Sequence, residues 1–168
     1  MDAERVEFVE ERANRSKVAE VFESLLAQLT SLLPGAAVEH IGSTSIRGSI
    51  TKGDLDVCVQ VEGTGFQEAD RILGERFARN VGSGRTESFS SFVDDSWAVP
   101  VGVQLVAAGG AEDTFLQWRD LLRSSPEIQG RYDELKRRWH GRSHAEYRTA
   151  KAKFIEETLR TAPIRPAR

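Results

Sequence analysis

Residues 40–61, HIGSTSIRGSITKGDLDVCVQV, carry the side chains of this chain that are best suited to chemistry. The first part of the segment is a glycine followed by three hydroxyl residues, at positions 42–45. Eleven positions after Ser43 comes Asp54, followed by Asp56 and an apolar run. A loose, hydroxyl-rich loop therefore stands close to paired carboxylates, and each part suggests a binding chemistry.

The two aspartates are expected to point to the same side of a strand. From Leu55 onward apolar residues alternate, so Leu55 and Val57 share a core face and Asp54 and Asp56 lie on the opposite one. The strand rise places the two Cα atoms about 6.5–7 Å apart. Like charges this close repel each other, and a bound cation relieves the repulsion. Oxygen ligands suit Mg²⁺ or Mn²⁺ better than zinc, and Mg²⁺ takes further ligands from water and substrate phosphates. A phosphorylated partner is therefore expected.

The loop before the aspartates is suited to holding that phosphate. Gly42, Ser43 and Thr44 leave a predicted strand and offer backbone N–H groups and hydroxyls to phosphate oxygens. Lys52 adds a cation nearby. Taken singly, a Gly-Ser pair is usually a turn, and Asp-x-Asp at a strand entrance is more often a solvated edge. Their combination is much rarer, and it predicts a phosphate cradle followed by a metal-binding pair.

The rest of the chain must position this segment, and its patterns predict an α+β fold. Apolar periodicity predicts strands at 37–41, 55–61, 86–93 and 98–107 and helices at about 16–33 and 66–77. After residue 110 three apolar stripes at helical spacing follow, and Pro126 stands at a helix start. Strands followed by helices indicate a mixed β-sheet flanked by helices, with a helical C-terminal portion.

Length and composition predict one ordinary globular domain. Its sheet-bearing core is expected at about 7–108, its helical portion at about 111–160, and a disordered tail at 161–168. The lone Cys58 excludes an internal disulfide and fits a reducing compartment. No apolar run approaches the roughly 20 residues of a membrane helix, and the acidic N-terminus is unlike a signal peptide. A cytoplasmic protein without membrane association is expected.

Charge is distributed unevenly along the chain. The net charge is −3, yet residues 1–118 carry 10 Lys/Arg against 19 Asp/Glu, and residues 119–168 carry 13 against 7. A basic C-terminal part facing an acidic N-terminal part could hold an anion between them, although solvated helix faces explain the pattern equally well. Nucleic-acid binding is not favoured, because the chain as a whole is acidic.

The arrangement of Gly-Ser, about ten residues and Asp-x-Asp opening a strand resembles the signature of the DNA polymerase beta-like nucleotidyltransferase superfamily. Within it the chain is similar to the GrpB-like family. Besides the segment above, FLQWRDLLRSSPE (115–127), YDELKRR (132–138) and YRTAKAKFI (147–155) are similar to motifs of that family in the same order. The resemblance runs from about residue 7 to residue 160.

The resemblance implies a Mg²⁺-dependent enzyme that transfers a nucleoside monophosphate from a nucleoside triphosphate, expected to be ATP, to a small-molecule or protein hydroxyl with release of pyrophosphate. Asp54 and Asp56 would hold the metal, and the glycine-serine loop would grip the outer phosphates. Lys136 and Lys151 are the expected phosphate cations of the C-terminal portion, with Arg119 behind them. Tyr147 stands four residues before Lys151 on one helix face, where the two could flank a base and a phosphate.

The chain departs from the superfamily pattern in one place. The resemblance implies a third carboxylate on a later strand, but on the aspartate side of that strand this chain has Gln104. An amide can contact a metal, a water or a phosphate, but it brings no charge and cannot act as a base. Asp94 or Asp95 in the preceding turn could substitute. The alternative function is therefore a binding module for a nucleotide or a coenzyme-A-related phosphate that has lost turnover. A toxin–antitoxin or antibiotic-modifying system is a third hypothesis, and the sequence does not identify the acceptor.

Overall fold

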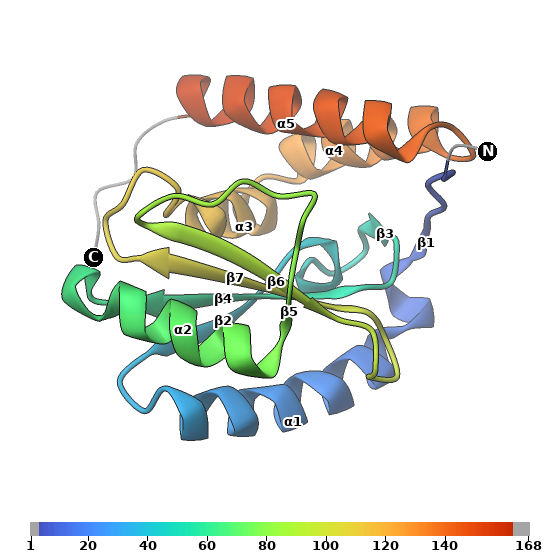
Figure 1. The fold of residues 1–168 in the computed structure, drawn as a ribbon. Coiled ribbons are helices and arrows are strands. Elements are labelled where there is room, and N and C mark those ends of the chain that lie inside the picture. Colours follow the sequence, from blue (N-terminus) through green and yellow to red (C-terminus); the bar gives the residue numbers. More distant parts are fainter. Residues whose placement is uncertain (1–3, 163–168) are drawn as a thin grey trace.

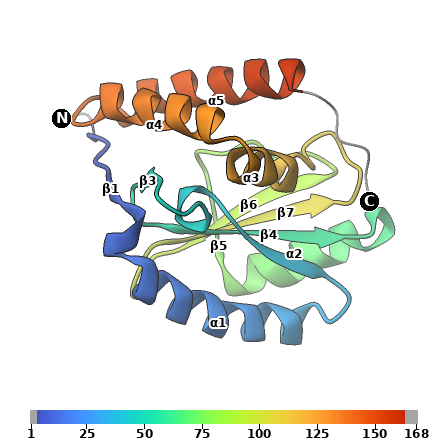
Figure 2. The same cartoon turned by 180° about the vertical axis from the view of Figure 1, so that it is seen from behind.

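A computed structural model of the chain, in which residues 4–162 are described, contains a five-stranded mixed β-sheet with helices on both faces (Figures 1 and 2). The strand order is β2-β4-β7-β6-β5; β4 and β7 run parallel, and the other neighbours are antiparallel. These strands are β2 (Ala37–Ile41), β4 (Leu55–Val61), β5 (Ala78–Arg79), β6 (Phe89–Asp94) and β7 (Val101–Ala107). The arrangement confirms the predicted α+β fold with a mixed sheet.

The helices form one layer on each face of the sheet (Figures 1 and 2). α1 and α2 cover one face, and α3, α4 and α5 cover the other, which confirms the helical C-terminal portion. The five helices are α1 (Arg15–Leu32), α2 (Phe66–Arg76), α3 (Phe115–Ser124), α4 (Pro126–Trp139) and α5 (His144–Thr161). The tail predicted at 161–168 begins at the last residue of α5, and residues 163–168 lie outside the described part.

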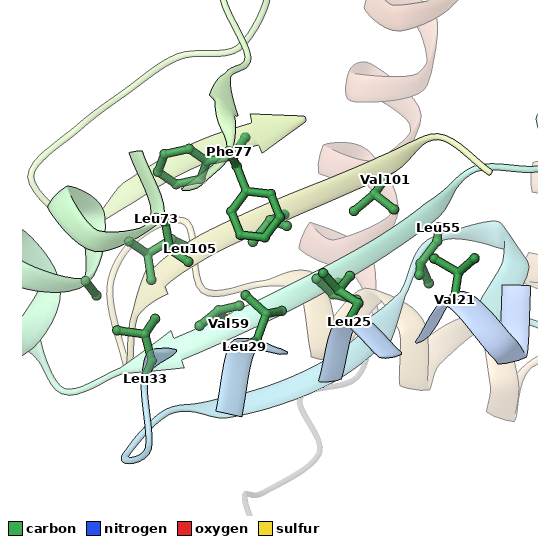
Figure 3. Close-up of a cluster of buried hydrophobic side chains, with 14 of the residues drawn as sticks. Val21, Leu25, Leu29, Leu33, Leu55, Val59, Leu73, Phe77, Val101 and Leu105 are labelled. Atoms are coloured by element: carbon green, nitrogen blue, oxygen red, sulfur yellow. The ribbon is translucent and has the colours of Figure 1, made fainter. Parts of the chain in front are cut away.

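The main core lies between the sheet and the layer of α1 and α2 (Figure 3). Val21, Leu25 and Leu29 recur at helical spacing on α1 and are buried, because this stripe faces the sheet. Leu55 and Val59 of β4 meet that stripe and are fully buried, as period-two alternation predicts. This packing fixes which face of β4 is turned to the core, and so fixes the direction of the aspartates.

The parallel β4–β7 pair brings the polar faces of two strands together. In register, Asp56 stands opposite Gly102 and Cys58 opposite Gln104. Val103 of β7 is fully buried in the main core, so its neighbours Gly102 and Gln104 face the layer of α3, α4 and α5. The aspartates and Gln104 therefore share one face of the sheet, as predicted.

Three two-residue strands are too short to leave a periodic signal in the sequence, and the sequence analysis does not predict them. One is β5; the others, β1 (Val9–Glu10) and β3 (Ile50–Thr51), form a small antiparallel pair. β3 ends three residues before Asp54. The N-terminal segment also joins the α4–α5 turn, where Val6 donates a backbone hydrogen bond of 2.9 Å to the carbonyl of Arg142. The segment of residues 4–10 thus connects the C-terminal helices to the aspartate loop.

Strands β6 and β7 each begin three residues later than predicted, at Phe89 and Val101. Their connection is longer because Asp94 organises it: its carboxylate accepts hydrogen bonds from the backbone N–H of Ser96 at 2.9 Å and from Trp97 Nε1 at 3.0 Å. Pro100, which has no N–H to donate, then precedes β7.

None of the helices between residues 4 and 162 combines the length and the apolar character needed to cross a bilayer. The two longest, α1 and α5, have 18 residues each and carry exposed charged side chains.

Candidate active site at the start of strand β4

Asp54 and Asp56 lie side by side at the start of β4, and both line a cavity of about 280 Å³ between the sheet and the layer of α3, α4 and α5. The side chain of Asp54 is 26% exposed, and Asp56 is half-buried. Both point away from the main core because Leu55 and Val57, which alternate with them, are fully buried in it. The prediction that the two carboxylates share one face is confirmed.

Two glycines leave the space that the Asp56 carboxylate fills. A Cβ atom added at Gly42 would lie 2.9 Å from Asp56 Oδ2, and one added at Gly102 would lie 2.3 Å from Asp56 Oδ1. Gly42 also has φ +74°, a left-handed conformation that side chains disfavour. The carboxylate is therefore enclosed from two directions by backbone that carries no side chain. Gly102 is a site residue that the sequence analysis misses, although a glycine inside the apolar strand 98–107 is the usual signal of a close approach.

Burial and the neighbouring charge of Asp54 raise the pKa of Asp56 from an ordinary 3.8 to about 6. Lys151, Lys52 and the Gln104 amide act in the opposite direction and favour the charged form. Lys52 Nζ lies 3.2 Å from Asp54 Oδ2. Despite the two lysines, burial and the charge of Asp54 still disfavour the charged form of Asp56, which is the electrostatic setting in which a cation binds.

The glycine-serine loop forms a short 3₁₀ turn, Ser43–Ser45, beside the aspartates. Within the described part of the chain, the N–H groups of Ser43 and Thr44 donate to no other group. Gly42 and Ser43 line the cavity, and their role as a phosphate cradle stays a prediction. Thr44 does not line it: its hydroxyl donates to the carbonyl of Asp54 at 3.0 Å and contacts His40 Nε2 at 3.0 Å. Thr44 thus fixes the loop to the backbone of Asp54.

Of the residues expected from the C-terminal helices, the cavity includes Tyr147, Lys151 and Arg119 but not Lys136. The hydroxyl of Tyr147 interacts with that of Tyr132, which also lines the cavity, and burial raises the pKa of both phenols. Lys151 is on the same face of α5, four residues from Tyr147, and its charge acts on Asp56. Tyr147 and Lys151 thus line the same cavity, and that they flank a base and a phosphate stays a prediction.

The expectation that Lys136 contacts phosphate needs correction. Its ammonium is buried and donates to Asp133 Oδ1 at 3.0 Å, to Ser49 Oγ at 3.0 Å and to the carbonyl of Ile50 at 2.7 Å. It also lies 4.1 Å from the ring centre of Tyr132. Desolvation lowers the pKa of Lys136 to about 8. All its donors are used inside the protein, so this lysine connects α4 to the β3 segment that leads to Asp54.

The carboxylates fit one divalent cation and not two. Within residues 4–162 no group of three or more His, Cys, Asp or Glu side chains is arranged to hold a metal. On β7 the places nearest Asp56 are taken by Gly102 and Gln104. Asp94, a suggested substitute, is held by Ser96 and Trp97 in its own turn, and neither it nor Asp95 lines the cavity. A single Mg²⁺ with two protein carboxylates and further ligands from water and phosphate matches this donor set.

Away from the aspartates the cavity has aromatic and polar walls that the sequence analysis does not assign to the site. Phe89 of β6 and Phe115 of α3 stack at 6.0 Å between ring centres. Asn80, Ser91 and Arg148 provide hydrogen-bonding groups in the same cavity. These residues come from elements far apart in the sequence, so no local motif marks them. Chemically, one end of the cavity suits phosphate and metal, and the other suits a planar apolar group.

Comparisons with known proteins agree with this architecture. The family model described as "GrpB protein" matches residues 9–161. A UPF0157 protein of Vibrio cholerae serotype O1 is 39% identical over 133 residues, covering 79% of this chain and 70% of that protein. The crystal structure of GrpB from Enterococcus faecalis superposes with a TM-score of 0.72 at 23% identity, covering 91% of this chain and 97% of the other.

More distant structures share the fold alone. A Cid1 poly(U) polymerase described as bound to MgATP is similar with a TM-score of 0.50 at 13% identity, and the match covers 73% of this chain but only 40% of the polymerase chain. The fold is therefore nucleotidyltransferase-like, which confirms the fold that the resemblance implies. From the family model and the Vibrio relative, the chain belongs to the GrpB protein family.

Proposed function

We propose that the chain is a magnesium-dependent nucleotidyltransferase that moves a nucleoside monophosphate from a nucleoside triphosphate to a small-molecule or protein hydroxyl. The observation that carries the proposal is the Asp54–Asp56 pair, two carboxylates on one face of β4 with Asp56 enclosed by Gly42 and Gly102. Such a pair is costly to keep charged without a cation, and the fold supplies the space around it.

Asp54 and Asp56 are the proposed ligands of Mg²⁺ or Mn²⁺, and the bound ion would supply charge neutralisation at the transferring phosphate. The N–H group of Ser43, which donates to no other group within residues 4–162, would donate to a phosphate oxygen, since backbone donors at such a turn favour anions. Lys52 and Lys151 would neutralise the remaining phosphate charge. The new bond joins the acceptor oxygen to the α-phosphorus, and the bond to the pyrophosphate leaving group breaks.

The partners proposed are a nucleoside triphosphate, with ATP as the expected donor, and an acceptor whose identity the cavity does not reveal. The stacked pair Phe89 and Phe115 at the apolar end is suited to a nucleobase. A cytoplasmic location is part of the proposal, and it rests on the single Cys58, which is buried and unpaired.

The test is thermal stability with ATP, GTP, CTP and UTP in turn, each with Mg²⁺ and with EDTA. A nucleotide at 100 times its dissociation constant adds about 2.7 kcal/mol, which a melting curve resolves. Stabilisation by one nucleotide that disappears with EDTA and in Asp54→Asn/Asp56→Asn supports the proposal. If none of the four nucleotides binds in a metal-dependent way, the proposed function is contradicted. Pyrophosphate release, assayed with the nucleotide so identified, then tests turnover.

A second candidate is the binding module that retains the phosphate cradle without turnover. The observation that favours it is the amide of Gln104 and the bare backbone of Gly102 where a further carboxylate would complete a two-metal centre. It predicts stabilisation by nucleotides or coenzyme-A-like phosphates that persists in EDTA and in the double variant, with no pyrophosphate release.

A further inference from the structure

A second cavity, of about 600 Å³, lies beside the edge strand β2, where the glycine-serine loop meets α1 and α3. It shares no lining residue with the aspartate cavity. Its walls come from the 3₁₀ turn of the loop, from one side of α1 and from Arg123 of α3. Nothing in the proposed transfer reaction uses it, so its charges and its apolar surface need a separate explanation.

Two guanidinium groups in this cavity have no acidic partner. Within residues 4–162, neither Arg47 nor Arg123 forms an ion pair with a carboxylate. Arg123 donates only to the carbonyl of Ser45, from Nε at 3.2 Å and Nη2 at 3.0 Å. Burial, and to a smaller extent the charge of Arg119, lower the pKa of Arg123, whereas Asp120 and Glu39 act in the opposite direction. Both guanidinium groups line the cavity, where an oxyanion could accept charge-assisted hydrogen bonds from them.

The acidic residues of the cavity do not supply that anion. Glu11 is buried and is engaged by Arg15 through two hydrogen bonds, Nε to Oε1 at 2.7 Å and Nη2 to Oε2 at 2.6 Å. The second Glu11 oxygen also accepts from the backbone N–H of Gly48 at 3.4 Å. Glu23 also lines the cavity, and like Arg47 and Arg123 it is exposed. The pair of Glu11 and Arg15 is therefore neutral, and with Glu23 counted against Arg47 and Arg123 the lining keeps a net charge of +1.

The same cavity has an apolar part, called here its floor. Val18 and Phe22 of α1 form it together with the ring of His40, which stacks on Phe22 at 5.2 Å between ring centres. Burial lowers the pKa of His40 to about 4, so the ring is neutral at physiological pH. The Thr44 hydroxyl has one hydrogen and donates it to the carbonyl of Asp54, so toward His40 it can only accept. The imidazole proton of His40 is therefore on Nε2, which donates to Thr44. The floor is uncharged.

We propose that this second cavity is a binding site for a small oxyanion carried on a planar apolar group, with Arg47 and Arg123 binding the oxyanion and the floor of Val18, Phe22 and His40 contacting the apolar group. Phosphate esters and carboxylates share this chemistry. The site is independent of the proposed nucleotidyl transfer. It is joined to the aspartate cavity through Thr44, whose hydroxyl connects His40 on one side to the backbone of Asp54 on the other.

The test titrates the full chain with phenyl phosphate, benzoate and inorganic phosphate at constant ionic strength, and follows the backbone amide NMR signals of residues 44–47 and 123. We expect saturable shifts there, with phenyl phosphate or benzoate binding about tenfold more tightly than inorganic phosphate because the ring buries apolar surface. The stronger of the two organic probes identifies the head group. The proposal is overturned if inorganic phosphate binds as tightly as the organic probes, or if these residues show no saturable shift.

Variants distinguish this site from the aspartate cavity. Arg47 has no side-chain hydrogen bond within the described residues, so Arg47→Gln is expected to leave the fold intact and to weaken phenyl phosphate at least tenfold. Arg138→Gln removes the same charge from an exposed position on α4 and is the matched control. Lys52→Gln/Lys151→Gln should leave binding unchanged. If that double variant abolishes the shifts while Arg47→Gln does not, the anion binds at the aspartate cavity and the proposal is wrong.

Discussion

Asp56 and Gly102 stand in register on the parallel strands β4 and β7, and a methyl group at position 102 would lie 2.3 Å from Asp56 Oδ1. That distance is shorter than any ordinary contact, so the carboxylate and a side chain at this position exclude each other. The Asp56 carboxylate can therefore occupy its place in the cavity only because residue 102 is a glycine.

Gly102→Ala is the first prediction. The new methyl group must displace the carboxylate or the strand, so metal-dependent nucleotide binding should fall at least tenfold and stability should drop by about 1–3 kcal/mol. Isothermal titration with Mg²⁺ and the nucleotide found in the thermal screen, and urea unfolding, measure both effects. The control is Gly63→Ala, where an added Cβ meets no atom within 4 Å. Unchanged binding in Gly102→Ala would mean that the position of Asp56 is not needed.

The second prediction concerns how the folding stability of the metal-free protein depends on pH. The pKa of Asp56 is about 6 in the folded protein, against 3.8 ordinarily, so the folded state binds more protons between about pH 4 and pH 6. Stability contributed by this group is therefore full at low pH and is lost as pH rises through 6. In Asp56→Asn the side chain stays neutral at every pH, so this loss of folding stability does not occur. At pH 7.5 in EDTA the melting temperature of Asp56→Asn should therefore exceed that of the wild type by a few degrees.

The comparison needs melting curves from pH 4.5 to 7.5 in EDTA for the wild type, Asp56→Asn and Asp95→Asn. Asp95 is exposed and serves as the control for charge removal. The gap between wild type and Asp56→Asn should close toward the acid end. A gap that is constant across this range, or an Asp56→Asn variant less stable than the wild type at pH 7.5, would contradict the raised pKa.

The third prediction separates Lys136 from the phosphate-binding residues. Lys136→Met leaves Asp133 buried without its cation, and losing one partner of a buried pair typically costs about 3–5 kcal/mol. Urea unfolding should record a loss of that size, whereas Lys153→Met on the exposed side of α5 should change stability by less than about 0.5 kcal/mol. Nucleotide affinity measured on the folded fraction should change little. A large loss of affinity with normal stability would restore Lys136 as a phosphate ligand.

The sequence was sufficient to predict those features that depend on local periodicity. Alternation from Leu55 to Val61 places the aspartates on one face, and helical spacing predicts α1 to within one residue at each end. Gly42, Ser43, Lys52 and Lys151 also line the cavity as expected. These predictions succeed because neighbouring residues in one element fix each other's direction.

The features that escaped prediction depend on contacts between distant segments. Lys136 is buried because Asp133 and the carbonyl of Ile50 meet it, and the second of these belongs to a strand 86 positions earlier. Phe89 and Phe115 become neighbours only once β6 lies beneath α3. Gly102 matters because β7 is parallel to β4, a pairing that periodicity alone does not specify.

The last prediction tests the missing third carboxylate directly. Gln104 lies on the aspartate face of β7, and its amide favours the charged form of Asp56. Gln104→Glu replaces that amide with a carboxylate of the same length, so Mn²⁺ should bind more tightly, and the free protein should become less stable at pH 7.5 through added repulsion. Mn²⁺ titration followed by electron paramagnetic resonance measures the first effect, and melting in EDTA the second. Gln104→Leu, which removes the polar group without adding charge, is the control.

If Gln104→Glu also raises pyrophosphate release above the wild type, the third acid was limiting and the natural chain is closer to the binding module. If it binds Mn²⁺ no better than Gln104→Leu, the side chain at this position does not reach the metal.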